Sequence, residues 1–221
     1  MYQTFKIDDK CIKMDINKIS SKLWIIRGLS ITDESDPKYL NSLLLSKLYR
    51  CEFHDLVLRD QNISFEDFKF LASSAKKVTV MWGSIIKYKN EKIVMFDKIM
   101  ECLPNIENLY FAFHDDSMIN SEMMKNILKL KNFENLKNLS LYNIPESLSV
   151  KDISAFIKKY KNMKFWLIFC NISNEYKEQL DALVDEIIES GVPYRYLEYE
   201  EQDLEKETIM RNRYFKEHLQ D

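Results

Sequence analysis

Residues 136–144 read LKNLSLYNI and place leucines at positions 136, 139 and 141, in the spacing L-x-x-L-x-L. The same spacing, with other apolar residues admitted, recurs in five further stretches that begin at Phe53, Ala75, Ile106, Met163 and Tyr194. The six starting points, from 53 to 194, are separated by 22, 31, 30, 27 and 31 residues. Intervals of about 28 residues are typical of the long leucine-rich repeats, in which each repeat holds one strand and one helix.

The segments between these stretches carry the apolar periodicity of helices. Five of them, SFEDFKFLASSA, MFDKIMECL, SEMMKNILKL, SVKDISAFIKKY and NEYKEQLDALVDEIIES, place apolar residues three or four positions apart. Ser64 and Ser149 each precede an aspartate by three residues, which is the capping pattern of a helix start. The alternation predicts an α/β fold, a leucine-rich-repeat-like solenoid of alternating parallel strands and helices with about six to eight irregular repeats.

The predicted repeats form one continuous domain with three parts. Residues 1–50 are expected to be degenerate N-terminal capping repeats, residues 51–202 the repeat core and residues 203–221 a C-terminal capping helix. A consensus repeat carries asparagine three residues after the last leucine of its strand. Here that place holds Gln61, Gly83, His114, Ile144, Asn171 and Gln202. Because only Asn171 fits, an irregular open α/β sheet is the structural alternative.

Two longer stretches resemble a known family. SFEDFKFLASSAKKVTV with KIVMFDKIMECLPNIENLYFAF, and NLKNLSLYNI with ISAFIKKYKNMKFWLIF, are similar to the leucine-rich-repeat-like regions of nematode F-box proteins, including those with an FTH-type F-box-associated region. The resemblance implies a substrate receptor of a cullin–RING ubiquitin ligase, in which the F-box docks onto the ligase and the repeats bind the substrate. No F-box-like segment precedes the repeats here, so the ligase-docking part is expected to come from another chain or to be missing.

Composition and charge argue against several kinds of function. The formal net charge is -3, so we expect no basic field that attracts nucleic acid. The sequence has no run of about 18 apolar residues that predicts a membrane span. The N-terminal residues lack the apolar core of a signal peptide, which indicates a cytoplasmic or nuclear protein. Three glycines and four widely separated cysteines offer no phosphate-binding loop and no metal-ligand spacing, so neither a cofactor nor a metal is expected.

The candidate binding surface is one face of the predicted sheet. If the leucines point toward the helices, the residues between them point to the concave face. That face becomes aromatic toward the C-terminus, and it is expected to bind a protein partner through Tyr110, Tyr142, Phe165, Phe169 and Tyr196. The alternative is that a helix over residues 203–218 covers these rings through Ile209, Tyr214 and Phe215.

The sequence therefore favours a non-enzymatic protein–protein interaction module of the substrate-recognition type, with an indirect link to a cullin–RING ubiquitin ligase implied by the resemblance. Two other interpretations remain open. One is a truncated family remnant that has no partner. The other is an enzyme of unknown type that uses His114, Asp115 and Asp116, which form a polar loop directly after a predicted strand.

Overall fold

The computed structural model describes residues 2–7, 10–15, 18, 20–32, 46–52, 54–81, 83–120 and 122–215. Of the predicted capping segments, residues 1, 8–9, 16–17, 19, 33–45 and 216–221 lie outside the described residues, as does Phe53, where the first of the six stretches begins. The chain divides into two compact units, Met1–Glu107 and Asn108–Asp221. Each unit holds parallel strands together with helices, so the predicted α/β class is confirmed.

The first unit is built around three parallel strands in the order β4-β6-β8. Its strands are β1 (Tyr2–Ile7), β2 (Lys10–Asp15), β3 (Leu23–Ile25), β4 (Gly28–Thr32), β5 (Leu48–Cys51), β6 (Asp55–Arg59), β7 (Asn62–Ser64), β8 (Lys77–Met81) and β9 (Ile85–Lys87). Its described helices are α2 (Phe65–Ala72) and α3 (Phe96–Glu101). The remaining strands form two-stranded pairs, of which β1 with β2 is antiparallel and β3 with β5 and β7 with β9 are parallel.

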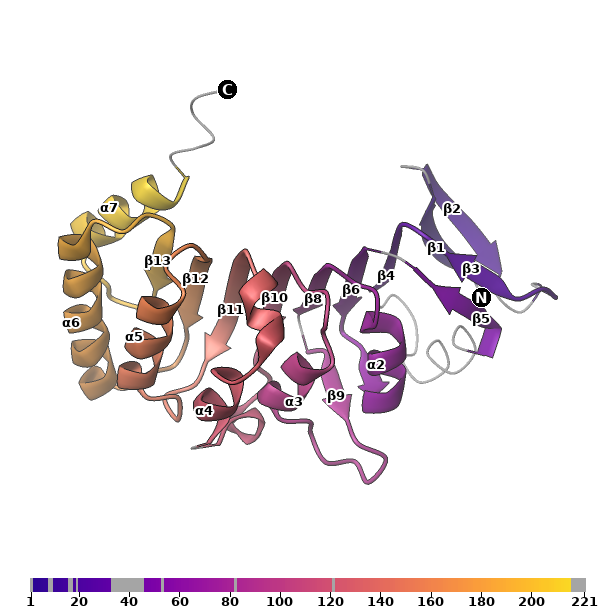
Figure 1. Cartoon of the computed structure of the whole chain (residues 1–221), viewed down its shortest axis with the longest axis horizontal. Helices are drawn as coiled ribbons and strands as arrows, with labels where there is room; N and C mark the ends of the chain where they lie inside the picture. Colours follow the sequence, from indigo (N-terminus) through magenta and orange to yellow (C-terminus); the bar gives the residue numbers. More distant parts are fainter. Residues whose placement is uncertain are drawn as a thin grey trace. The chain divides into compact units, whose positions relative to one another are not determined.

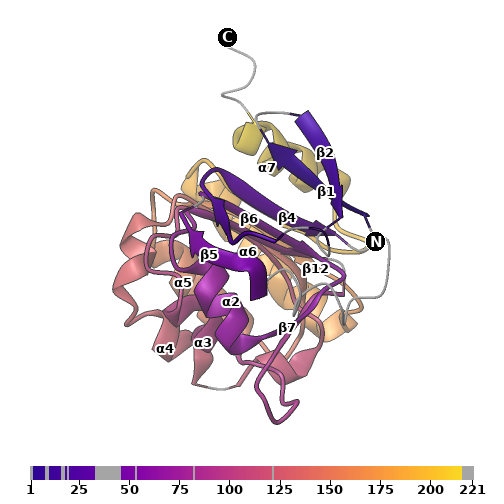
Figure 2. The same ribbon diagram turned by 90° about the vertical axis from the view of Figure 1, so that its right-hand side faces the viewer.

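The core of the first unit includes the inner face of this sheet and the inner face of α2. Leu56 and Leu58 of β6 are fully buried, because side chains two residues apart on a strand point to the same face. Phe68 and Leu71 lie one helical turn apart on α2 and are also fully buried. Figure 2 shows α2 on one side of β4 and β6.

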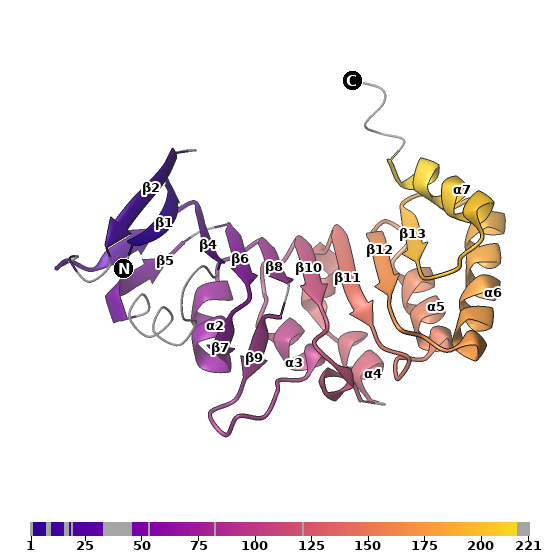
Figure 3. The same cartoon turned by 180° about the vertical axis from the view of Figure 1, so that it is seen from behind.

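The second unit has four parallel strands in the order β10-β11-β12-β13, which lie side by side in Figures 1 and 3. These strands are β10 (Asn108–Ala112), β11 (Asn138–Ile144), β12 (Lys164–Phe169) and β13 (Arg195–Glu198). The described helices are α4 (Met123–Ile127), α5 (Val150–Lys159), α6 (Asn174–Ser190) and α7 (Leu204–Phe215), with the 3₁₀ helices η2 (Asp116–Met118) and η3 (Lys131–Asn135).

Both predicted serine caps are confirmed. Ser64 Oγ accepts a hydrogen bond from the backbone N of Asp67 at 3.1 Å before α2. Ser149 Oγ accepts one from the backbone N of Asp152, also at 3.1 Å, before α5. Each bond satisfies one of the backbone N–H groups that the first turn of a helix leaves without an intrahelical acceptor.

One face of the sheet in the second unit forms a core against α5 and α6. The ring of Phe165 on β12 lies 5.5 Å from that of Phe156 on α5, measured between centroids. The ring of Phe169 lies 6.1 Å from that of Tyr176 on α6. Leu167, between the two phenylalanines on the same face of β12, is buried as well. The two helices therefore cover the face to which these three side chains point.

The prediction that Phe165 and Phe169 point to the open face is wrong, because they are 0% and 1% exposed. β12 reads KFWLIF and is apolar at every position except Lys164, so no alternation of polar and apolar residues along the strand distinguishes its two faces. A shift of one residue moves every side chain of a strand to the other face. In the structure the two phenylalanines contact the helices and Trp166 takes the open face.

Left-handed backbone recurs where strands end. The residues concerned are Asp60, Gly83, Asn143, Asn171 and Glu201, with φ between 52° and 73°. The Nδ2 of Asn143 donates a hydrogen bond to the carbonyl oxygen of Phe113 at 2.9 Å, which ties the end of β11 to the residue that follows β10. The asparagine that bonds to the neighbouring strand's end is therefore Asn143, one residue before Ile144, the position that the consensus spacing indicates. Asparagine tolerates left-handed backbone better than most residues do.

Replacement of Phe165 by alanine tests the corrected orientation of β12. We expect Phe165→Ala to lower the free energy of unfolding by about 3–5 kcal/mol, because it leaves a cavity between β12 and α5. Phe70 on α2 is 42% exposed and provides a matched control. Phe70→Ala is expected to cost about 0.5 kcal/mol or less. Equal losses for the two variants, in urea unfolding followed by circular dichroism, would show that Phe165 does not point into the core.

Two replacements of Asn143 separate its backbone conformation from its hydrogen bond. Asn143→Gly and Asn143→Ala both lose the bond to Phe113, which contributes about 0.5–1.5 kcal/mol. Alanine must in addition adopt left-handed backbone, at a further cost of about 1–2 kcal/mol. We expect thermal unfolding to rank the wild type first, Asn143→Gly second and Asn143→Ala last. An alanine variant as stable as the glycine variant would contradict the left-handed conformation.

Candidate functional site

The sheet face opposite α5 and α6 in the second unit carries a group of aromatic rings. Tyr110, Ser140, Trp166 and Tyr196 are cross-strand neighbours, one on each strand from β10 to β13. The ring of Trp166 lies 5.6 Å from that of Tyr196 and 6.2 Å from that of Tyr142. We call the surface made of Tyr110, Tyr142, Trp166 and Tyr196 the aromatic face.

The aromatic face brings together three of the five predicted binding residues, Tyr110, Tyr142 and Tyr196. It does not include Phe165 or Phe169, which lie in the core. Trp166, which the sequence analysis does not select, takes their place on β12. The residue type could have indicated this orientation. A tryptophan needs an acceptor for its N–H group and is therefore less suited to a closed core than phenylalanine.

α7 covers the part of the aromatic face that lies on β12 and β13. Tyr214 and Phe215 are at the end of this helix, and each of their rings lies 5.9 Å from that of Trp166. Tyr196 is only 3% exposed, and its hydroxyl donates a hydrogen bond to Glu207 Oε1 at 3.0 Å. α7 is thus the helix that the alternative prediction expects to cover these rings. Because α7 buries Tyr196, this residue is not accessible to a partner.

Polar contacts hold α7 in place. At its start, Asp203 Oδ1 accepts hydrogen bonds from two backbone N–H groups of the first turn, at 2.8 and 3.0 Å. The Nζ of Lys206 lies 2.5 Å from Asp185 Oδ1 on α6. Near the other end, Arg213 Nη1 donates to the carbonyl oxygen of Ile188 at 2.8 Å. α7 is therefore fixed to α6 at both ends as well as to the aromatic rings.

The part of the aromatic face on β10 and β11 is half-buried rather than covered. Tyr110 and Tyr142 are both partly accessible to solvent. Beside them, the Nδ2 of Asn138 donates a hydrogen bond to Asn108 Oδ1. Burial, followed by the charges of Tyr110 and Glu198, raises the pKa of the Tyr142 hydroxyl. This hydroxyl is therefore neutral at pH 7, and the open part of the face presents uncharged polar and aromatic groups.

One polar atom within the aromatic face has no hydrogen-bond partner among the described residues. It is the indole Nε1 of Trp166, which is buried. A buried donor without an acceptor costs about 1–3 kcal/mol. α7 therefore covers Trp166 without satisfying its N–H group.

The loop of His114, Asp115 and Asp116, the alternative catalytic site, has a structural role. Asp115 Oδ1 accepts hydrogen bonds from the backbone N of Ser117 at 2.8 Å and from its Oγ, and these bonds cap η2. The bonds from Ser117 lower the pKa of Asp115. His114 Nε2 lies 3.8 Å from Asp115 Oδ2, and all of these side chains are exposed. A solvated carboxylate that caps a turn gives no support to acid–base catalysis at this loop.

Comparison of the chain with protein-family models, with curated proteins and with solved structures finds no match in any of the three. Among the described residues, no three His, Cys, Asp or Glu side chains are grouped in a way that could hold a metal ion. In the part of the chain that the structure describes, no helix is both long and apolar enough to cross a membrane. Function is therefore inferred from the geometry of the aromatic face.

Tyr214 makes the packing of α7 depend on pH. Burial raises the pKa of its hydroxyl from 10.0 to about 12. In the unfolded chain this hydroxyl ionises first, so the stabilisation from the packed ring is complete below pH 10 and is lost as the pH rises toward about 12. We expect the free energy of unfolding in urea to fall more steeply above pH 10 for the wild type than for Tyr214→Phe, which has no hydroxyl. Parallel curves for the two proteins would contradict the half-buried position of the Tyr214 ring.

Proposed function

We propose that the chain is a non-enzymatic protein–protein interaction module of the substrate-recognition type. The observation that carries the proposal is that part of the aromatic face is accessible to solvent. On β10 and β11, Tyr110 and Tyr142 are half-buried, and the ring of Tyr142 lies next to the covered Trp166. Tyrosine and tryptophan are enriched among the residues that dominate binding energy, because they bury a large area with little loss of conformational freedom. A protein partner that binds here continues the cover that α7 provides over β12 and β13.

The polar groups on this surface suit a polypeptide ligand. The side-chain amides of Asn108 and Asn138 hold both donors and acceptors, and the backbone of a bound chain offers both as well. The rings of Tyr110 and Tyr142 then receive the partner's apolar side chains.

We infer that the strand–helix units are irregular leucine-rich repeats that form a solenoid. Two observations support this inference: parallel strands one repeat apart pair within each unit, and left-handed residues recur at the strand ends. The resemblance to nematode F-box proteins gives such a module the role of a substrate receptor. In that role it is linked to a cullin–RING ubiquitin ligase through another chain, in the cytoplasm or the nucleus.

Removal of the two half-buried tyrosines tests the proposed binding site. We expect the Tyr110→Ala/Tyr142→Ala double variant to lose a protein that the wild type retains in affinity capture from a nematode extract. Because truncation of a dominant interface residue costs about 2 kcal/mol or more, we expect recovery to fall at least about tenfold in quantitative mass spectrometry. Tyr49 of β5 is 74% exposed, and Tyr49→Ala is the matched control that is expected to keep the partner.

The capture experiment distinguishes the proposed function from its alternatives, provided that circular dichroism shows all variants to be folded. A protein retained equally by the wild type and both variants would place the binding site away from the aromatic face. If the wild type retains nothing in repeated captures, the interpretation as a remnant without a partner gains support. Recovery of cullin–RING components together with the partner would support the link to a ligase.

A further inference from the structure

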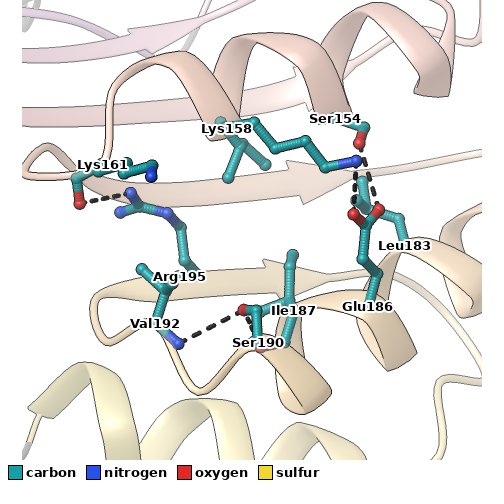
Figure 4. Close-up of a pocket in the computed structure, with 10 residues that line it drawn as sticks. Ser154, Lys158, Lys161, Leu183, Glu186, Ile187, Ser190, Val192 and Arg195 are labelled. Atoms are coloured by element: carbon teal, nitrogen blue, oxygen red, sulfur yellow. Dashed lines mark hydrogen bonds and ion pairs between the residues drawn. The ribbon is translucent and has the colours of Figure 1, made fainter.

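A pocket of about 250 Å³ lies between α5 and α6 in the second unit (Figure 4). Its wall is largely apolar and is formed by Ile157 of α5, Leu183 and Ile187 of α6, and Val192. None of these residues belongs to the aromatic face, which is on the opposite side of the sheet. The pocket is therefore independent of the proposed protein-binding function.

A buried arginine lines one end of this pocket. Arg195 is 2% exposed, and its Nη2 donates hydrogen bonds to the carbonyl oxygens of Tyr160 at 2.9 Å and Lys161 at 2.8 Å. Its Nη1 donates to the carbonyl oxygen of Met163. Its Nε has no partner among the described residues. Burial lowers the pKa of the guanidinium to about 10, so the group is charged at pH 7 and retains one unused donor.

The two ends of the pocket differ in charge. At one end Lys158 forms an ion pair with Glu186, and Ser154 Oγ donates to Glu186 Oε2 at 3.3 Å, so the charges there are balanced. Figure 4 shows the side chains of Lys161 and Arg195 together at the other end, away from Glu186. That end has an excess of positive charge beside an apolar wall.

We propose that this pocket binds a small aliphatic monocarboxylate whose carboxylate contacts Arg195 and Lys161. One carboxylate oxygen accepts the hydrogen bond of the Arg195 Nε–H group, and hydrogen bonds between two charged groups are about twice as strong as neutral ones. The hydrocarbon chain lies along Ile157, Leu183 and Ile187, where it leaves water.

The volume of the pocket limits the size of this ligand, and the hydrogen-bond donors at the positive end limit its charge. A cavity of about 150 Å³ holds benzene, with six non-hydrogen atoms. A pocket of about 250 Å³ therefore holds roughly ten, which is the number in octanoate. A phosphate ester has more oxygens and more charge than one buried N–H group and one exposed ammonium group can satisfy. A single carboxylate matches this set of donors.

Isothermal titration calorimetry with octanoate on the full chain tests the proposal. We expect saturable binding with a dissociation constant on the order of 0.1–1 mM, as is reasonable for a ligand of this size. Octan-1-ol has the same chain without the charge, and we expect it to bind at least about tenfold more weakly.

Three variants locate the binding to this pocket while leaving Arg195, which holds the end of α5, unchanged. Val192→Trp fills the pocket and is expected to abolish octanoate binding. Lys161→Gln removes the exposed charge at the positive end and is expected to weaken binding about three- to fivefold. Lys151→Gln changes an exposed lysine at the other end of α5, outside the pocket, and is the matched control that is expected to bind like the wild type.

The outcomes of these titrations are decisive in either direction. Weaker binding by Lys161→Gln together with wild-type binding by Lys151→Gln supports the site even if Val192→Trp does not fold. Absence of saturable binding of octanoate to the wild type at 5 mM, far above the order of magnitude expected for a ligand of this size, would overturn the proposal. Equal binding of octanoate and octan-1-ol, or equal binding by Lys161→Gln and Lys151→Gln, would overturn the role of the positive end.

Discussion

Parallel pairing is the constraint on which the second unit depends. Strands β10 to β13 all run in the same direction, so the chain must return along the sheet before each new strand begins. α5 and α6 make two of these returns on one face, where Phe156 and Tyr176 contact Phe165 and Phe169. The opposite face is left to the last helix, α7. A sheet face that α5 and α6 leave uncovered therefore follows from the connectivity of the chain, before any particular side chain is considered.

α7 determines how much of that surface is available. Its end carries Tyr214 and Phe215 onto Trp166, and Tyr196 beneath it bonds to Glu207. The helix leaves the indole N–H of Trp166 without an acceptor, so its contact with the rings is not fully complementary. The same helix thus completes the fold of the second unit and leaves the part of the aromatic face on β10 and β11 accessible to solvent.

The side-chain orientation of a strand can be predicted from the sequence only where polar and apolar residues alternate along it. In β11, NLSLYNI, polar residues alternate with leucines, so the outward position of Tyr142 could be predicted. In β12, KFWLIF, apolar residues on both faces leave no such alternation, and the sequence prediction places the phenylalanines on the wrong face. The pocket between α5 and α6 could not be predicted, because Arg195 bonds to carbonyl groups more than 30 residues earlier in the chain. No spacing in the sequence reports a contact of that kind.

β13 lies at an edge of the sheet, so α7 affects more than the aromatic face. β13 is the last strand in its order and spans only Arg195–Glu198, so none of the described strands lies on one side of its backbone. Edge strands of this kind pair readily with strands of other molecules, and proteins protect them by keeping them short or by covering them. α7 lies against β13 and is anchored to α6. If the aromatic face binds a partner as proposed, colloidal stability and recognition are coupled, because a change that loosens α7 to expose more of this face also weakens the protection of the sheet edge against self-association.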